Sequence, residues 1–401
     1  MPSLLTFEKL KAAVSGNTAA VRSITRLQPV GGPGSKVFPP THSGGVYAWE
    51  RRRMNNGETV PTVLLDSVQS QANRMEQALL DAHQAEKLRF PILEVDFTKD
   101  FPDIGVITTL DAPHRIADAI FRDSLLNETK FRESDIGKAF EAANIRNATA
   151  IFRYCPHALV FGVWDSTGSK GGLGNKFQRV VDSEIVGIQA ERGVHTSSRI
   201  DPLGITTAAE LYEAKNGDWT LEQGQAKKTS KGDPVKAKPS DFVHGNIPPT
   251  IEKDEQGRDP IRGGVSIDYA VQTTVISFPA LRRLRFVVNE KDSQECNNAA
   301  RTVLAALALA GIAHLRELGY DLRSRCLLVP EGETPFELVA NDGKSEPFTL
   351  TPEQSQKLLA DAVTQAKTSG LTWEEKIIKL TPEPRLLELV RKSRLAKVPE
   401  E

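Results

Sequence analysis

Basic side chains close to glycines are the residues of this sequence that could do chemistry, and that chemistry would be the binding of a polyanion. Between Thr18 and Val60 the chain carries six Lys or Arg residues and only two acidic ones. Arg22 and Arg26 are four residues apart in a strand-like run, so they share one face of that strand. Tyr47 and Trp49 precede an arginine triplet, and basic residues interleaved with aromatic ones suit phosphate neutralisation and base stacking.

Two further segments repeat this pattern. The glycine-rich segments 31–45 and 166–174 are predicted loops, and the N–H groups of such loops can form an anion-binding nest. The predicted helix start at 67–74 adds free N–H groups and a favourable dipole. These residue types do not show whether the bound polyanion is RNA, DNA or a nucleotide. The candidate polyanion-binding residues are Arg22, Arg26, Lys36, Arg51, Arg52, Arg53, Ser67, Gln69, Gln71, Asn73, Arg74, Lys170, Asn175, Lys176 and Arg179.

Motifs of enzymes and of resident cofactors do not appear in the sequence. The second glycine loop lacks the GK[ST] ending of a P-loop, and neither loop opens a helix as a dinucleotide fingerprint requires. There is no CxxC, HExxH or GxSxG pattern. Cys155 and His157 are predicted to be structural, as is His114. We therefore expect no catalytic residue, no metal and no cofactor.

Composition sets the class of protein. The chain has 401 residues, of which 39% are hydrophobic and 26% are charged, which excludes disorder along its whole length. The net charge of −1 excludes a global attraction to nucleic acid, so such binding must depend on local clusters. Three cysteines suit a reducing compartment. The sequence shows no signal peptide, and its most apolar run, 303–313, is shorter than a membrane span. We expect a cytoplasmic protein without a membrane partner.

The pattern of elements predicts an α+β fold. Strands and helices do not alternate regularly, which argues against a doubly wound sheet. Asp66 is predicted to cap a helix whose apolar face begins at Val68, with Gln69 at capping-box spacing. Segment 214–263 is rich in Gly, Pro and Lys and is predicted to be an insertion. Predicted strands are 21–30, 61–65, 91–97, 104–110, 158–164, 177–189, 265–278, 322–329 and 336–340; the other predicted helices are 112–126, 133–144, 297–318, 351–366 and 384–395.

Four long blocks resemble one protein family. They read VRSITRLQPVGGPGSKVFPPTH, VPTVLLDSVQSQANRMEQALL, TLDAPHRIADAIFRDSLL and HALVFGVWDSTGSKGGLGNKFQRVVDSEIVG. The sequence resembles the backbone subunit of type I-U (also called I-G) CRISPR surveillance complexes, in the RAMP superfamily, over roughly residues 5–340. The resemblance implies an RRM-like, ferredoxin-like core with large insertions, one of them a thumb-like hairpin. It also implies a subunit that polymerises along CRISPR RNA and presents this guide to target DNA within Cascade, beside other Cascade subunits.

Under this resemblance the candidate residues would contact the guide RNA, and the subunit would not be catalytic. The predicted organisation is a discontinuous core of residues 1–213 and 264–345, an inserted lobe of 214–263 and a C-terminal helical segment of 346–401. Two alternatives stay open. A RAMP-type endoribonuclease would need an acid or a histidine beside the bound backbone, and Asp165 or His157 could supply it. A module that binds a small phosphate ligand would use the glycine loops instead.

Overall fold

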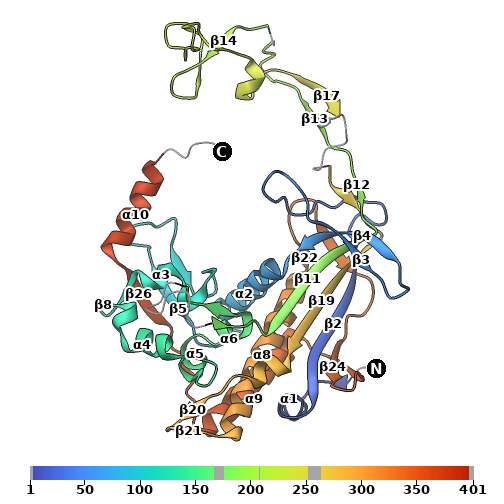
Figure 1. Ribbon diagram of the computed structural model, residues 1–401, viewed down its shortest axis with the longest axis vertical. Coiled ribbons are helices and arrows are strands. Elements are labelled where there is room, and N and C mark those ends of the chain that lie inside the picture. The colour runs from blue at the N-terminus through green and yellow to red at the C-terminus, as the bar shows by residue number, and fades with distance from the viewer. Residues whose placement is uncertain (1–2, 167–175, 207, 252–262, 397–401) are drawn as a thin grey trace.

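A ten-stranded sheet forms the body of the protein (Figure 1). The computed structural model describes residues 3–166, 176–206, 208–251 and 263–396. The central strands β2, β19, β11 and β4 pair antiparallel in that order. The path through the sheet is β1 (Ser3–Leu4), β25 (Ser345–Thr349), β24 (Phe336–Ala340), β2 (Thr18–Pro29), β19 (Tyr269–Ser277), β11 (Val181–Ile188), β4 (Thr59–Asp66) and β3 (Trp49–Arg53), while β23 (Leu327–Pro330) pairs with β2 and with β22 (Tyr320–Asp321). The α+β fold class is confirmed.

Helices cover one face of this sheet. Residues of β19 alternate between buried and partly exposed, so its even-numbered side chains face the helices. The central helix α8 (Gln294–Leu318) is long and apolar enough to cross a membrane, but 94% of its most apolar stretch is buried within the protein, where it serves as the core helix. The other helices of this layer are α1 (Phe7–Ser15), α2 (Val68–Gln84), α6 (His157–Phe161), α7 (Phe278–Arg282) and α9 (Pro352–Thr368).

A second, five-stranded sheet lies beside the helical layer. Its middle strand β26 (Ile378–Pro382) pairs parallel with β5, from the other end of the sequence. The segment 346–401 therefore contributes strands as well as the helices α9 and α10 (Pro384–Leu395). The remaining elements here are β5 (Leu93–Asp96), β6 (Val106–Thr108), β7 (Ser124–Leu126), β8 (Thr129–Lys130), α3 (Ala119–Arg122), α4 (Asp135–Ala142), α5 (Thr149–Tyr154) and the 3-10 turns Arg115–Ala117 and Phe131–Glu133.

A long arm projects from the end of the main sheet (Figure 1). Two antiparallel pairs form its stem, β12 (Glu191–Arg192) with β18 (Val265–Ser266) and β13 (Thr196–Arg199) with β17 (Ile247–Ile251). Its tip is a small sheet of β14 (Leu211–Glu213), β15 (Trp219–Thr220) and β16 (Lys236–Ala237), followed by the 3-10 turn Pro239–Phe242. The predicted lobe 214–263 contains most of the tip, whereas the paired strands of the arm start at Glu191.

Four local predictions were wrong. Segment 322–329 is extended only from Leu327 onward, because Arg325 takes a left-handed φ of 60° in the turn before it. Segment 112–126 is not one helix, because Arg115 takes a left-handed φ of 53° and Asp118 then caps the short helix α3. Segment 158–164 is not a strand: α6 ends at Gly162, whose φ is 86°, and only β9 (Val163–Trp164) is extended. Asp66 does not cap α2; it is the last residue of β4, and Ser67 is the cap.

Other predictions are confirmed in place. The predicted helix after residue 66 is α2, and the predicted helix 351–366 is α9, which Thr351 caps and whose capping box Gln354 completes. The predicted helices 133–144, 297–318 and 384–395 correspond to α4, α8 and α10, and the predicted strands 21–30, 61–65, 177–189 and 336–340 overlap β2, β4, β11 and β24.

Candidate nucleic-acid interface

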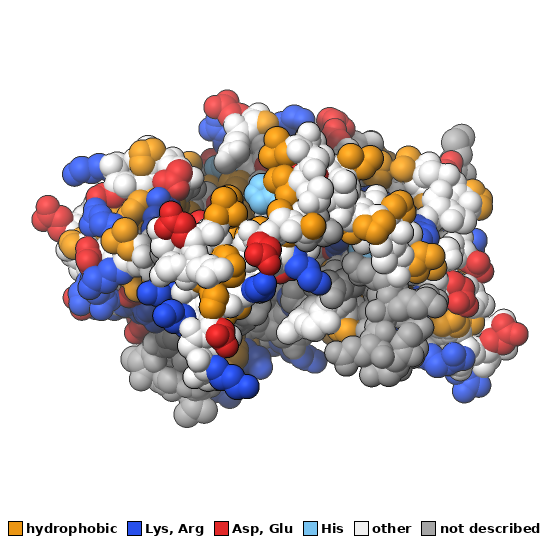
Figure 2. Space-filling view, turned by 90° about the horizontal axis from the view of Figure 1, so that it is seen from above, with side chains coloured by type: hydrophobic (Ala, Val, Ile, Leu, Met, Phe, Trp, Pro, Cys, Tyr) orange, Lys and Arg blue, Asp and Glu red, His pale blue; other side chains and the backbone are white. Residues whose placement is uncertain are grey.

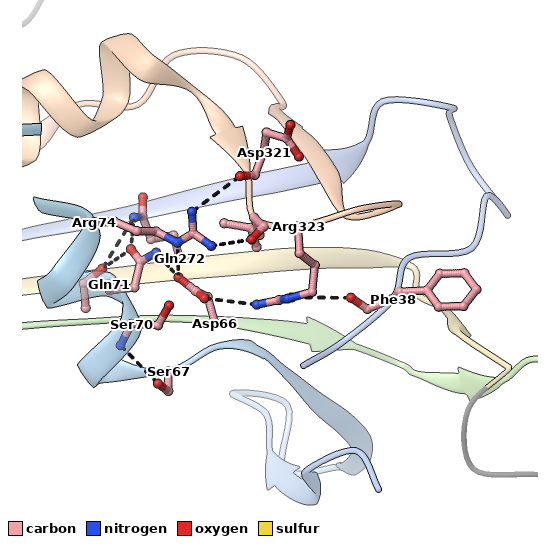
Figure 3. A network of polar contacts seen from close by, with 11 residues as sticks. Phe38, Asp66, Ser67, Ser70, Gln71, Arg74, Gln272, Asp321 and Arg323 are labelled. Carbon is pink, nitrogen blue, oxygen red and sulfur yellow. Dashed lines mark hydrogen bonds and ion pairs between the residues drawn. The ribbon is translucent and has the colours of Figure 1, made fainter. Parts of the chain in front are cut away.

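A fully buried carboxylate organises the start of α2 (Figure 3). Asp66 Oδ2 accepts from Arg74 Nε at 2.9 Å and from Gln71 Nε2 at 2.6 Å, and its Oδ1 accepts from Arg323 Nη2 at 3.2 Å. The Arg74 and Arg323 side chains remain 28% and 25% exposed. One buried anion therefore holds two cations whose outer edges reach solvent, which leaves a local charge of +1 at the surface.

The backbone beside this cluster fixes the two guanidinium groups further. Arg74 also donates to the carbonyl oxygens of Leu322 and Asp321, and Arg323 Nη1 donates to Phe38 O at 3.4 Å. The first glycine loop, the start of α2 and the turn after β22 are thus joined at one place. Contacts of this kind orient arginines for phosphate recognition because less side-chain freedom is lost on binding.

Gln71 lies in the interior instead of on the surface where it was predicted. Its side chain is 1% exposed, and its Oε1 accepts from Ser183 Oγ at 3.0 Å and from Gln272 Nε2 at 2.8 Å. Tyr320 donates to Gln272 Oε1 at 3.2 Å and extends this buried network to β22. A satisfied network of this kind fixes α2 on the sheet, so Gln71 positions the helix and does not face a ligand.

The other predicted residues of α2 lie at its surface. Ser67 accepts a hydrogen bond from Ser70 N at 3.2 Å and caps the helix. Gln69 and Asn73 are exposed, and their spacing of four places them on one helical face. The start of α2 therefore presents two neutral polar side chains beside Arg74 and Arg323.

The first glycine loop packs against the base of the arm. Lys36 Nζ donates to Val194 O at 3.0 Å and to Gly263 O at 3.3 Å. Gly193 and Gly263 approach so closely that a Cβ on Gly263 would lie 1.9 Å from Gly193 O. Lys36 therefore anchors the arm to the loop, and the glycines serve this close contact.

Aromatic side chains here pair with arginines. Arg325 lies 4.1 Å from the Phe38 ring centroid, and Arg192 lies 5.3 Å from the Trp49 ring centroid. Tyr47 is buried, and its hydroxyl accepts from Gly264 N at 3.2 Å. Arg192, Arg323 and Arg325 were not among the residues predicted from the sequence, although the RSR run in 323–325 was a visible basic signal inside a predicted strand.

Two predicted arginines of β2 lie on the face of the sheet away from α2. Arg22 pairs with Glu337 at 2.7 Å, and Arg26 pairs with Glu331 and stacks 3.6 Å from the Tyr269 ring centroid. Exposed ion pairs of this kind contribute only about 0–1 kcal/mol. They can exchange partners, but their charges are already compensated.

In the arginine triplet of β3, only Arg52 is paired with carboxylates among the described residues. Arg52 contacts Glu184 at 2.5 Å and Glu50 at 2.8 Å, and these carboxylates raise its pKa. Arg51 donates to Thr59 O at 2.7 Å, and Arg53 is exposed. Among the described residues, neither Arg51 nor Arg53 has a carboxylate partner. These two retain a charge that a ligand could use.

The second basic group lies just before the first residue of β11. Lys176 is exposed and Arg179 donates to Phe161 O at 3.3 Å, while Lys170 and Asn175 lie outside the described residues. Asp66 of the first group pairs with Ile185, six residues after Arg179, so the two groups are separated by at most roughly 20 Å along the chain. Figure 2 shows basic, acidic and hydrophobic side chains mixed over the upper face, without a continuous basic stripe among the residues described there. The structure therefore distributes the predicted residues over several places: the start of α2 with the first glycine loop, the outer face of the main sheet, and the segment just before β11.

The two suspected catalytic groups are held in structural contacts. Asp165 accepts two hydrogen bonds from Arg132, at 2.5 and 2.9 Å. His157 is fully buried 3.3 Å from Cys155 Sγ, and burial lowers its pKa to about 3 and raises that of Cys155 to about 12. A histidine and a thiol in these states provide neither a base nor a nucleophile at neutral pH. In the described part of the chain, no group of His, Cys, Asp and Glu could hold a metal ion.

Comparison with known proteins gives one family. Residues 21–192 match the family described as CRISPR-associated protein GSU0053. The match agrees with the resemblance expected from the sequence and supports a role as a CRISPR-associated protein and subunit of a CRISPR complex. No curated protein matches the chain.

Proposed function

We propose that this protein is the backbone subunit of a type I-U Cascade complex, and that it polymerises along CRISPR RNA and presents the guide for pairing with target DNA. One observation carries the proposal: all fifteen predicted contact residues lie within residues 21–192, which match the CRISPR-associated family. We propose further that the subunit acts in the cytoplasm, with other Cascade subunits and without a catalytic activity of its own.

The order of the central strands supports an RRM-like core. Along the chain, β2, α2, β11, β19, α8 and β23 give the order βαββαβ of ferredoxin-like folds. In the sheet, β23 and β19 flank β2, and β11 follows β19. The β3–β4 hairpin and the arm are then insertions into this core.

The basic groups at the start of α2 and just before β11 support binding of a single strand. Single-stranded RNA requires a backbone-neutralising surface, which can be discontinuous along the strand, and positions where bases can stack. The contacts of Asp165 and His157 disfavour the alternative of a ribonuclease that uses these residues.

Expression with and without a CRISPR array tests the proposal. We expect the protein purified at moderate salt to carry discrete, guide-length RNA and to form a large species by light scattering only when the array is present. An RNA-free monomer from both preparations would overturn the proposal for the subunit alone.

A matched pair of variants tests the start of α2. Gln69→Glu with Asn73→Glu places two negative charges there, and we expect it to reduce the RNA carried. Gln84→Glu makes the same kind of change at an exposed position at the other end of α2 and should leave RNA content unchanged. Equal RNA content in both variants would remove the start of α2 from the interface.

A further inference from the structure

Trp164 is a large aromatic side chain that the fold leaves half exposed. Its exposed fraction is 50%, whereas Val163 and Asp165 on either side are 5% and 2% exposed. Because side chains alternate along a strand, burial of both neighbours directs Trp164 outward. Burial of apolar surface stabilises a fold, and about half of the Trp164 side chain does not contribute to it. By contrast, Trp373 is 5% exposed and belongs to the core.

The backbone beneath Trp164 is held firmly. β9 pairs antiparallel with β10 (Lys176–Phe177), so that Lys176 stands opposite Trp164 and the buried Phe177 opposite Val163. Gly162 has a φ of 86°, and a Cβ there would lie 3.1 Å from Arg179 N. Asp165, the residue after Trp164, is held by two hydrogen bonds from Arg132. The indole is therefore presented by a preorganised ribbon, which lowers the entropy lost on binding.

One cationic group lies over the indole. Lys176 Nζ lies 5.5 Å from the ring centroid of Trp164, and in the described ranges no carboxylate pairs with Lys176. An exposed aromatic ring beside a cation fits a base with its phosphate better than an apolar protein surface.

We propose that Trp164 is a stacking platform for one nucleobase of the bound single strand, and that Lys176 neutralises a phosphate beside that base. The inference rests on the proposed function and adds to it a contact that depends on the base itself. Alanine substitution of a stacking aromatic weakens binding by roughly 5- to 150-fold.

Binding of a labelled single-stranded RNA by the full-length protein tests this inference. We expect Trp164→Ala to weaken binding within that range, and Trp164→Phe to restore most of it. Trp219→Ala, at a 42% exposed tryptophan on the arm, is the matched control and should bind as the unaltered protein does. Lys176→Met keeps the aliphatic stem and should reduce the salt slope by about 0.7.

An abasic RNA of the same length separates stacking from other effects. Loss of the bases should remove the difference between Trp164→Ala and the unaltered protein. An unchanged affinity in Trp164→Ala, or an equal loss on both RNAs, would overturn the inference. If Trp164→Ala kept its RNA affinity but lost self-association by light scattering, Trp164 would be a protein contact. If the unaltered protein bound neither RNA, the proposed function itself would fail.

Discussion

Replacement of Asp66 by Asn removes the charge that holds two arginines at the start of α2. Loss of one partner from a buried ion pair typically costs 3–5 kcal/mol. Arg74 and Arg323 are about a quarter exposed, so water would solvate part of the freed charge. We therefore expect a loss of about 3 kcal/mol in the free energy of unfolding. Loss of the actual cap, in Ser67→Ala, should cost only about 1 kcal/mol.

Thermal unfolding measures this difference. An unfolding entropy of about 2.1 cal/mol/K per residue gives roughly 0.8 kcal/mol/K for this chain. Asp66→Asn should then lower Tm by about 4 °C and Ser67→Ala by about 1 °C. Asp182→Asn, at an exposed carboxylate of β11, is the control and should change stability by less than about 0.5 kcal/mol. A Tm shift for Asp66→Asn no larger than that for Ser67→Ala would refute the buried-carboxylate reasoning.

Three further predictions concern other parts of the molecule. Burial lowers the pKa of His157 to about 3, so only the unfolded chain takes up this proton as the pH falls below 6.5. The free energy of unfolding, measured in urea and compared with that of His157→Leu, should therefore fall by up to about 1.4 kcal/mol per pH unit. A difference between the two proteins that stays constant with pH would contradict this prediction. Gly263→Ala places a Cβ against a backbone oxygen at the base of the arm and should speed limited proteolysis there, whereas Gly224→Ala, with open space around it, should not; equal cleavage rates would exclude the close contact. Arg53→Gln should reduce the salt slope of RNA binding by about 0.7, whereas Arg52→Gln should change it less because two carboxylates already neutralise that charge; equal slopes would show that the internal ion pairs open on binding.

The sequence by itself determined the elements whose signals are local. The apolar spacing from Val68 onward predicted α2, and the run of β-branched residues in 177–189 predicted β11. The predicted helix 351–366 is α9. The basic, glycine-rich character of the candidate interface was also visible, because charge and backbone freedom are properties of residue type.

Only the tertiary structure decided which of these residues meet. In the sequence, Asp66 followed by a helical pattern resembles an N-cap. In the structure it is instead the buried carboxylate of an ion pair with Arg323, which lies 257 positions later in the chain. The main sheet places Arg22 and Arg26 on the face away from Arg74, and the pairing of β26 with β5 joins segments that no local period connects. Such contacts depend on sheet order and register, which are set by the burial of the whole core and therefore cannot be read from neighbouring residues.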